Sequence, residues 1–447
     1  MLAIVISRAD DASRHVGDHL RDLEDWSLDR DDSRADTDGG GDVWRLEDVE
    51  LRTFEERHLE LENVAAAFDE PDLLVFASKH AGETGRLLTA HHTGNFGPAE
   101  FGGDDHALAR ACPFAHKRVV ETLDAHAPAD YDIGMECTHH GPTTVGVPSM
   151  FVEVGSDQPQ WDDPDAARAV AKAILDLRGV SPDASSEHGT RRHLVGFGGG
   201  HYVPRFERIV RETDWAVGHI AADWCLDAMG DPATHRDVIR TAFEESAADF
   251  ALLADDRPAL RDVIEALGFR VVSETFARES TGVPLPVVEA VEDALGAVDS
   301  GTRFGDLAKD CDGDFDVASL PTELREHVQG IDQDSARTAV EARTVGFETE
   351  ESGTRLGDRI AVPSQVERRA IVEEFAAILE SKYDTVEIES AAIVAQETAF
   401  DPEKAQALGI SEGPAFGKLS AGQSVEVGGR TIPPEAVHEQ RTHRFPI

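Results

Sequence analysis

The sequence predicts an α/β protein with three layers, in which a mixed sheet is covered by helices on both faces, followed by a C-terminal α+β extension. Short apolar runs of strand length recur through the first 275 residues, and helical patterns lie between many of them. Motifs that carry histidine stand at the ends of several runs. Because layered α/β folds place their ligand sites at strand ends, we expect the chemistry at one edge of the sheet.

The strands are predicted from short and mainly apolar runs. They cover residues 2–7, 73–77, 87–91, 133–137, 149–154, 193–197, 215–220, 250–254 and 270–273. The clearest helical patterns cover residues 106–125, 163–177, 204–211, 233–245 and 258–267. The second of these opens with Asp163 and the last with Pro258, as helix starts commonly do.

A chain of 447 residues is long enough for two or three domains. We expect a catalytic region over residues 1–297, a linking helical segment over 298–342 and an accessory module over 343–447. The module is marked by a helical pattern at 365–381 and a polar strand-turn piece near 425–432. Residues 21–50 are so acidic and glycine-rich that they predict a mobile surface insertion.

The charge balance indicates a high-salt environment. Asp and Glu number 87 against 42 Lys and Arg, which gives a net charge of -45, and only seven of the 42 basic residues are Lys. The acidic residues are spread along the whole chain, whereas an acidic interaction tail would form one block. Self-repulsion of this size loosens a fold at low salt, but a Debye length of about 3 Å at molar salt screens it.

Cysteine usage and hydropathy point to the cytoplasm. The four cysteines lie far apart without a CxxC pair, which excludes a four-thiolate zinc site and a disulfide framework. No run of 18 apolar residues occurs, and the first residues lack the features of a signal peptide. We expect a cytoplasmic monomer without membrane association.

Five motifs carry the candidate chemistry, and each lies in or just after a predicted strand. They are SKH at 78–80, HHTGN at 91–95, ECTHHGPT at 136–143, GFGGGHY at 196–202 and GH at 218–219. Imidazole and carboxylate groups are zinc ligands, usually three or four per ion. In the third motif, Gly141 and Pro142 favour a turn that lets Glu136, His139 and His140 converge. Adjacent histidines on a strand would otherwise point to opposite faces.

The glycine run 196–201 permits two interpretations. It can form a tight turn that displays His201, and its backbone N–H groups can also contact a phosphate ahead of the helix at Pro204. The run lacks the Lys and Ser/Thr of a P-loop and the spacing of GxGxxG. None of the five motifs contains a GxSxG elbow, and Cys137 is the single cysteine within them, so nucleophilic catalysis is a minor option.

Taken in order, these motifs resemble the archaeal and plant type of D-aminoacyl-tRNA deacylase over roughly residues 1–275. The sequence differs from that family pattern at HHTGN, where an aromatic-Pro pair is expected before Gly94-Asn95. The resemblance implies hydrolysis of the ester between a D-amino acid and the 3′ end of tRNA. It also implies dependence on Zn²⁺, with two ions per subunit, and a fold of the phosphorylase and peptidyl-tRNA hydrolase type.

The residues themselves leave open which groups bind metal and which act as general base. Our working assignment names His91, His139, His140 and His219 as metal ligands. It names Glu136, His80 and His201 as catalytic residues. Contacts to the substrate are assigned to Lys79, Asn95, Thr138, Gly198, Gly199, Gly200 and Tyr202. Basic residues near the motifs that could neutralise tRNA phosphates are Lys79, Arg110, Lys117, Arg118, Arg191, Arg192 and Arg205.

Two other functions fit the same motifs. A zinc-dependent amidase or aminopeptidase-like enzyme would use the histidine and glutamate cluster on a small amide. A non-catalytic protein that binds the 3′ end of tRNA would use the glycine turns to hold phosphates. Within the extension, residues 408–435 are similar to a short segment of the tRNA 3′-processing endonuclease ribonuclease Z, which suggests a tRNA-handling module or a small folded appendage.

Overall fold

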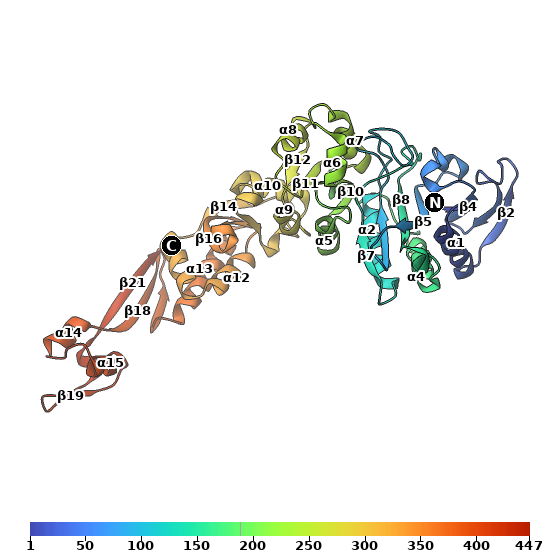
Figure 1. The fold of residues 1–447 in the computed structure, drawn as a ribbon. Helices are drawn as coiled ribbons and strands as arrows, with labels where there is room; N and C mark the ends of the chain where they lie inside the picture. Colours follow the sequence, from blue (N-terminus) through green and yellow to red (C-terminus); the bar gives the residue numbers. More distant parts are fainter. Residues whose placement is uncertain (188) are drawn as a thin grey trace. The chain divides into compact units, whose positions relative to one another are not determined.

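The computed structural model describes residues 1–187 and 189–447. These divide into two compact units, Met1–Thr281 and Gly282–Ile447. Figure 1 shows the elements of each unit in chain order. The protein is a mixed α/β structure, as the sequence predicts.

The first unit contains an eight-stranded mixed sheet. In spatial order its strands are β2 (Ser27–Asp31), β3 (Gly41–Arg45), β4 (Val49–Phe54), β1 (Leu2–Ser7), β5 (Leu73–Ala81), β8 (Ser149–Ser156), β6 (Leu87–His91) and β7 (Asp132–Met135). The central strands β4, β1, β5 and β8 are parallel and fully or almost fully buried. Strand β6 runs antiparallel to β8, and β7 runs parallel to β6.

Helices α1 (Asp11–Leu23), α2 (Pro113–His126) and α4 (Pro164–Leu175) pack on one another and on this sheet. Asp10 and Asp163 accept hydrogen bonds from the first backbone N–H groups of α1 and α4, which fixes where these helices begin. Around Ala3, Val5 and Phe151, the sheet is covered by the segment that contains the 3₁₀ turns His58–Glu60 and Val64–Ala67. A short helix, α3 (Gln158–Trp161), follows β8.

A second sheet of four parallel strands completes the unit. Its order is β10 (Ala216–Ala221), β9 (His193–Phe197), β11 (Phe250–Leu253) and β12 (Arg270–Val272). The helices of this part are α5 (Pro204–Glu212), α6 (Asp223–Met229), α7 (Arg236–Ser246), α8 (Pro258–Ala266) and α9 (Glu274–Glu279). Helix α2 contacts both β6 and β10, so it joins the two sheets.

The expectation of a single sheet is therefore wrong. The sequence shows where strands lie but not which strands pair, and the motifs at 196–202 and 218–219 belong to the second sheet. The predicted helix at 106–125 begins only at Pro113, which occupies a first-turn position after an irregular loop. The other predicted strands and helices agree with the structure to within a few residues.

Residues 21–50 form structure, in contrast to the predicted mobile insertion. Strands β2 and β3 pair as a hairpin, and β3 pairs with β4 at the edge of the first sheet. Arg52 ties the hairpin down because its guanidinium donates to Asp31 and Glu50. An added Cβ at Gly40 would lie 2.2 Å from the carbonyl oxygen of Arg34, so the connection needs a glycine there. The acidic side chains of this segment face mainly solvent and do not oppose the pairing.

The second unit has its own core. A four-stranded sheet has the order β13 (Thr302–Phe304), β15 (Gly346–Glu350), β16 (Arg355–Val362) and β14 (Asp316–Ser319). Its helices are α10 (Leu285–Leu295), α11 (Thr322–Ile331), α12 (Gln333–Glu341) and α13 (Gln365–Glu380), of which α11 and α13 match predicted helical segments. A three-stranded sheet of β17 (Thr385–Ile388), β18 (Ala392–Phe400) and β21 (His438–Pro446) follows.

The chain between β18 and β21 forms a small cluster of its own. It contains α14 (Pro402–Ala407), α15 (Pro414–Ser420), β19 (Val425–Val427) and β20 (Arg430–Ile432), which lie together beyond one end of the long pair β18–β21 (Figure 1). A separate apolar core of Ala405, Ile410, Leu419, Val425 and Val437 holds it. The predicted strand-turn piece near 425–432 is the hairpin β19–β20. Among the described helices of both units, none has the length and apolarity to cross a membrane.

Candidate active site

Seven side chains with nitrogen or carboxylate ligand atoms form one cluster in the first unit. His80 lies on β5, His91 ends β6, and Glu153 lies on β8. Glu136, His139 and His140 follow β7, and His201 follows the glycine run after β9. Within this cluster, three sets of residues place their ligand atoms within 4.8 Å of one another: His91, His139 and His140; Glu136, His139 and His201; and His80, Glu136 and Glu153. Six of the seven are predicted metal-binding or catalytic residues, and they come together from four motifs.

The first set has the tautomeric state that a metal site requires. The Nδ1 atoms of His91, His139 and His140 lie 3.1, 2.8 and 2.7 Å from the backbone oxygens of His92, Cys137 and Gly141. A carbonyl only accepts, so each Nδ1 carries the proton and each Nε2 of a neutral ring presents a lone pair. The Nε2 of His91 is buried and has no hydrogen-bond partner. Such an orphaned acceptor beside two further Nε2 atoms fits a bound cation.

Close backbone approach shapes the turn that carries two of these histidines. The N–H of Gly141 donates to the oxygen of Phe101 at 2.9 Å, and Gly94 donates to the oxygen of His140 at 2.8 Å. A Cβ at Gly141 would lie 2.4 Å from backbone atoms of Gly102 and Gly103, so no other residue fits. His140 itself has a φ of 48°, in the left-handed region. The expected turn at Gly141 is present, and it packs on the loop after β6.

Glu136 is a buried carboxylate that three side chains approach. Thr89 donates to Oε1 at 2.9 Å, and His201 Nε2 lies 2.7 Å from Oε2. The Nδ1 of His80 lies 3.2 Å from Oε1. Burial would raise the pKa of Glu136, but the hydrogen bonds from His201 and His80 hold it well below its ordinary value. Burial would conversely lower the pKa of His80, yet its contacts with Glu136 and Glu153 raise it to about 10.

Glu153 belongs to the site, although no sequence motif marks it. Its Oε1 lies 3.8 Å from His91 Nε2, and its Oε2 lies 3.7 Å from His80 Nδ1. Burial would raise the pKa of Glu153, but these two histidines lower it to about 2. The signal was a glutamate inside the apolar strand SMFVEVGS, since a fully buried carboxylate requires partners.

A cavity of about 430 Å³ opens onto the cluster. His80, His139, His140, Glu153 and His201 form part of its lining, together with Asp10, Lys79 and Phe101. Asp10 was not predicted either; its carboxylate accepts from the N–H of Ser13 at 2.9 Å and from the N–H of Lys79 at 3.2 Å. It thereby joins the start of α1 to β5 at the cavity wall. The Lys79 ammonium lies 4.7 Å from the centre of the Trp161 ring.

His219, a predicted metal ligand, lies outside the three sets of ligand atoms. It is buried; its Nε2 lies 2.8 Å from the oxygen of Ala109, and its Nδ1 lies 3.1 Å from the hydroxyl of Thr138. Both nitrogens are thus used within the protein. Burial lowers the pKa of His219 to about 4, which keeps the ring neutral. Thr138 also accepts from the N–H of Ile220 at 3.1 Å, so it links the turn after β7 to β10.

The remaining predicted contacts mostly hold the walls of the site. Asn95 donates to the oxygens of Gly102 and Asp104, within the loop after β6. The N–H of Gly198 donates to Ala221 at 2.7 Å, and that of Gly199 donates to the Asp223 carboxylate at 3.0 Å. These two amides are therefore engaged internally. The hydroxyl of Tyr202 lies 3.1 Å from Nε2 of His80, which places Tyr202 beside the cluster.

Comparisons with known proteins relate the chain to one family. A family model described as D-aminoacyl-tRNA deacylase matches residues 67–272, a range that holds all seven cluster residues. A protein named D-aminoacyl-tRNA deacylase from Haloarcula marismortui is 57% identical, with 100% of each chain covered. Proteins of the same name from Natronomonas pharaonis and Methanococcoides burtonii are 52% and 30% identical, over 100% and 98% of this chain and 100% and 95% of theirs.

Among solved structures, a crystal structure of a conserved protein of unknown function matches with a TM-score of 0.55 at 25% identity. The match covers 63% of this chain and 98% of that one. These three relatives match over 95% or more of their length and 98% or more of this chain, so the likeness includes the second unit as well as the site. The chain belongs to the D-aminoacyl-tRNA deacylase family.

Proposed function

We propose that the protein hydrolyses the ester bond of D-aminoacyl-tRNA and releases the free D-amino acid and tRNA. Membership of a family named for this activity supports the proposal. The observation that carries it is the set of three Nε2 atoms of His91, His139 and His140 beside the buried Glu136 and its partner His201. His139, His140 and His201 line a cavity of about 430 Å³. Ester hydrolysis needs an electrophilic centre and a proton-transfer group side by side, and this cluster supplies residues for both.

The metal is proposed to be zinc, with two ions per subunit. His91, His139 and His140 would hold one ion, because their Nε2 lone pairs converge and the buried Nε2 of His91 makes no hydrogen bond. The carboxylates of Glu136 and Glu153 would hold the second ion next to it, because the one free lone pair of His139 already serves the first ion. Zinc bound there supplies Lewis-acid chemistry, polarising an ester carbonyl and making water a better nucleophile near neutral pH.

The protein's own groups are proposed to manage the protons. His201 faces the cavity while its Nε2 is held by Glu136 at 2.7 Å, which is the arrangement of a general acid-base group and the carboxylate that orients it. His80 holds Glu136 and Glu153 through one ring nitrogen and lies 3.1 Å from the hydroxyl of Tyr202 through the other. Lys79, at the cavity wall, is proposed to face the substrate.

We further propose the finer features that the sequence predicts. The first unit is assigned to the phosphorylase and peptidyl-tRNA hydrolase type of fold, with the deacylase region at 1–297, the link at 298–342 and the accessory module at 343–447. The net charge of -45 supports a protein adapted to molar salt in the cytoplasm. A monomer whose partner is the 3′ end of tRNA is the proposed working state.

The test measures bound zinc and the deacylation of D-Tyr-tRNA together, in high salt, for wild type and for His139→Ala and His140→Ala. We expect each variant to lose both metal and activity. His126→Ala is the matched control, because His126 is a histidine on α2 that pairs with Asp176 at 2.7 Å outside the cluster. Full activity in both site variants would overturn the assignment.

Two further measurements separate the other functions that fit the motifs. A single turnover with enzyme in excess identifies a non-catalytic binding protein, which would leave the ester intact. Deacylation is also measured in the presence of free peptides. If the protein is an amidase, the peptides are its substrates and should compete with D-aminoacyl-tRNA for the site.

A further inference from the structure

Two aromatic side chains are conspicuously exposed, and both belong to the candidate site. Among the large apolar side chains that the structure describes as exposed, the aromatic ones are Phe101 and Trp224, at 66% and 49% exposure. A single exposed apolar residue is ordinary on a protein surface. Here, however, Phe101 lines the cavity of about 430 Å³, and Trp224 packs against His201, which lines the same cavity.

The backbone around Phe101 is held in place by several contacts. Its carbonyl oxygen accepts from Gly141 at 2.9 Å, directly after the metal-site histidines His139 and His140. The following Gly102 has a φ of 73°, and a Cβ there would lie 2.1 Å from the oxygen of Leu59. Asn95 donates to the oxygen of Gly102 at 3.0 Å. The Phe101 ring is therefore presented to solvent from a loop that has little room to rearrange.

Trp224 lies in the first turn of α6, which follows β10 of the second sheet. Its ring lies 6.3 Å from the His201 ring, centre to centre, and the two planes differ by 23°. The preceding Asp223 accepts from the N–H of Gly199 at 3.0 Å and from Arg257 at 2.6 Å. The first turn of α6 is thus joined to the glycine run that carries His201. The indole lies roughly parallel to the ring of the proposed acid-base group, and nearly half of Trp224 remains exposed to solvent.

The basic residues near the motifs are mostly engaged within the protein. Four of the arginines form ion pairs: Arg110 with Asp183, Arg118 with Glu121, Arg192 with Glu187 and Asp214, and Arg205 with Glu274. Lys117 donates to the backbone oxygens of Val210 and Thr213. Five of the seven basic residues that the sequence nominated for phosphate contacts thus already have partners. Their charges are balanced locally, so they offer a polyanion little attraction.

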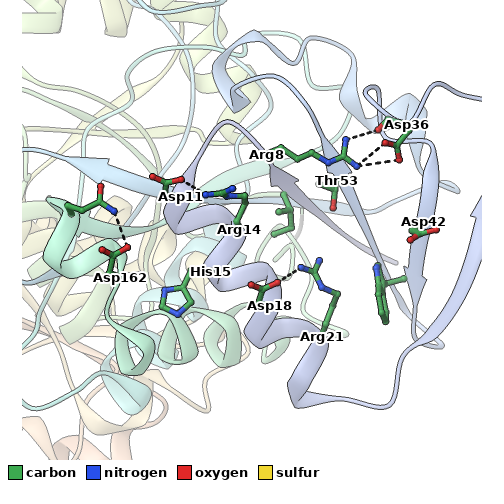
Figure 2. A pocket seen from close by; sticks show the side chains of 13 residues that line it. Arg8, Asp11, Arg14, His15, Asp18, Arg21, Asp36, Asp42, Thr53 and Asp162 are labelled. Carbon is green, nitrogen blue, oxygen red and sulfur yellow. Dashed lines mark hydrogen bonds and ion pairs between the residues drawn. The ribbon is translucent and has the colours of Figure 1, made fainter.

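A charged groove in the first unit does not supply the missing positive charge. This groove, of about 840 Å³, lies between α1 and the β2–β3 hairpin. Figure 2 shows that each of its arginines points at a carboxylate: Arg8 at Asp36, Arg14 at Asp11 and Arg21 at Asp18. Asp42 and Asp162 add further negative charge to the lining. A phosphate backbone would meet more negative than positive side chains there.

These observations favour recognition through the bases of the nucleic acid rather than its phosphates. Phosphate contacts weaken steeply as salt rises, whereas stacking of a base on an aromatic ring uses a face that every base possesses. Resting on the proposed function, we propose that Trp224 and Phe101 stack on the unpaired bases at the 3′ end of the tRNA and so place the ester at the histidine cluster. Affinity for this single-stranded end then survives in molar salt.

The first test measures binding without catalysis. The trinucleotide CCA, with which tRNA ends, is titrated into wild-type protein in 2 to 3 M KCl while tryptophan fluorescence is followed. We expect saturable quenching in wild type and none in Trp224→Leu. Trp224→Phe lacks the fluorescent ring, so its affinity is measured by calorimetry. We expect Trp224→Phe to bind CCA more weakly than wild type but more tightly than Trp224→Leu. Leucine keeps an apolar side chain beside His201 but has no π-face. Comparing Trp224→Leu with Trp224→Phe therefore separates base stacking from apolar packing.

The second test measures the kinetics on D-Tyr-tRNA for Phe101→Leu, Phe101→Tyr, Trp224→Leu and Trp224→Phe. Loss of one stacking ring in either leucine variant should raise KM by roughly 5- to 150-fold and leave kcat unchanged. In the aromatic variants Phe101→Tyr and Trp224→Phe, KM should stay close to the wild-type value. Leu28→Ala, at a 53% exposed apolar residue on β2, is the control and should leave KM unchanged.

The outcomes separate this inference from the proposed function. Deacylation by wild type with an unchanged KM in both leucine variants would overturn stacking and leave the deacylase proposal intact. Quenching by CCA that depends on Trp224, in a protein without deacylation, would support stacking and overturn the deacylase proposal. Absence of trinucleotide binding to wild type at millimolar concentration would also overturn stacking.

Discussion

The Nε2 of His201 lies 2.7 Å from Oε2 of Glu136, and this contact joins the two sheets of the first unit. Glu136 follows β7 of the eight-stranded sheet, and His201 follows β9 of the four-stranded sheet. The backbone reinforces the same junction, because the N–H of Cys137 donates to the oxygen of His201 at 2.9 Å. The proposed acid-base pair therefore exists only when the two sheets are packed together, and β7 and β9 position it jointly.

Glu136→Gln tests this pair. The amide keeps the shape of the side chain but removes the charge that orients His201, so we expect single-turnover deacylation of D-Tyr-tRNA to fall by roughly 10²- to 10⁴-fold. Glu121→Gln on the exposed part of α2 is the control and should retain full activity. The two variants must show the same circular dichroism. Activity of Glu136→Gln within threefold of wild type would contradict the assigned role.

Glu153→Gln tests a carboxylate of the cluster that no sequence motif marks. Its carboxylate faces the Nε2 of His91 at 3.8 Å and the Nδ1 of His80 at 3.7 Å, so the amide removes negative charge from beside a proposed metal ligand. We expect zinc affinity to fall by about 10- to 100-fold, as measured by competition with a chromogenic chelator. The surface variant Glu55→Gln should bind zinc like wild type. An unchanged affinity in Glu153→Gln would show that the carboxylate does not support the metal site.

Acid should destabilise the protein through its buried histidines. Burial lowers the pKa of His116 to about 4, against an ordinary value of 6.5. The folded ring then binds fewer protons than the unfolded one between these two pH values, so its contribution is fully present above pH 6.5. This contribution to the free energy of unfolding is lost as the pH falls toward 4. The difference between the two pKa values limits the loss to about 3 kcal/mol.

The measurement is denaturant unfolding at pH 7 and pH 5 in constant high salt. His116 packs against His92 in the interior, with ring centres 4.6 Å apart, and His116→Leu removes one titrating group. We expect a smaller loss of unfolding free energy between the two pH values in His116→Leu than in wild type. His126→Ala, outside the core, should show the wild-type loss. Equal losses in all three proteins would contradict the prediction.

Local patterns predicted the elements well because apolar periodicity depends on burial, which the sequence displays directly. Strand β6 has the predicted bounds Leu87–His91, and its last residue is a cluster member as expected. Pairing was not predictable, since nothing local distinguishes β9, in the second sheet, from β8, in the first. The hairpin β2–β3 was missed for a related reason: its stability depends on Arg52 of the neighbouring strand β4.

In the candidate site, too, local motifs predicted some residues, whereas others depend on the three-dimensional packing. His91, His139 and His140 were identified because each lies in a motif at a strand end. His219 shares that pattern, but its environment differs: the oxygen of Ala109 and the hydroxyl of Thr138 occupy its two nitrogens. Residue spacing does not reveal which way a ring faces. Glu153 has no motif, and only its charge within an apolar strand distinguishes it.

Gly141 provides a test of how the turn positions His139 and His140. A Cβ at this residue would lie 2.4 Å from backbone atoms of Gly102 and Gly103, and backbone cannot move aside as a flexible side chain can. Gly141→Ala should therefore displace the turn from the loop that holds Phe101, lower the free energy of unfolding by about 1–3 kcal/mol and reduce bound zinc. Gly330→Ala is the matched control, because no atom lies within 4 Å of an added Cβ there, within helix α11. That variant should keep its zinc and gain up to about 1 kcal/mol from helix propensity. Denaturant unfolding and metal analysis of both variants decide the matter: wild-type stability and zinc content in Gly141→Ala would show that the close approach at this turn does not constrain the two histidines.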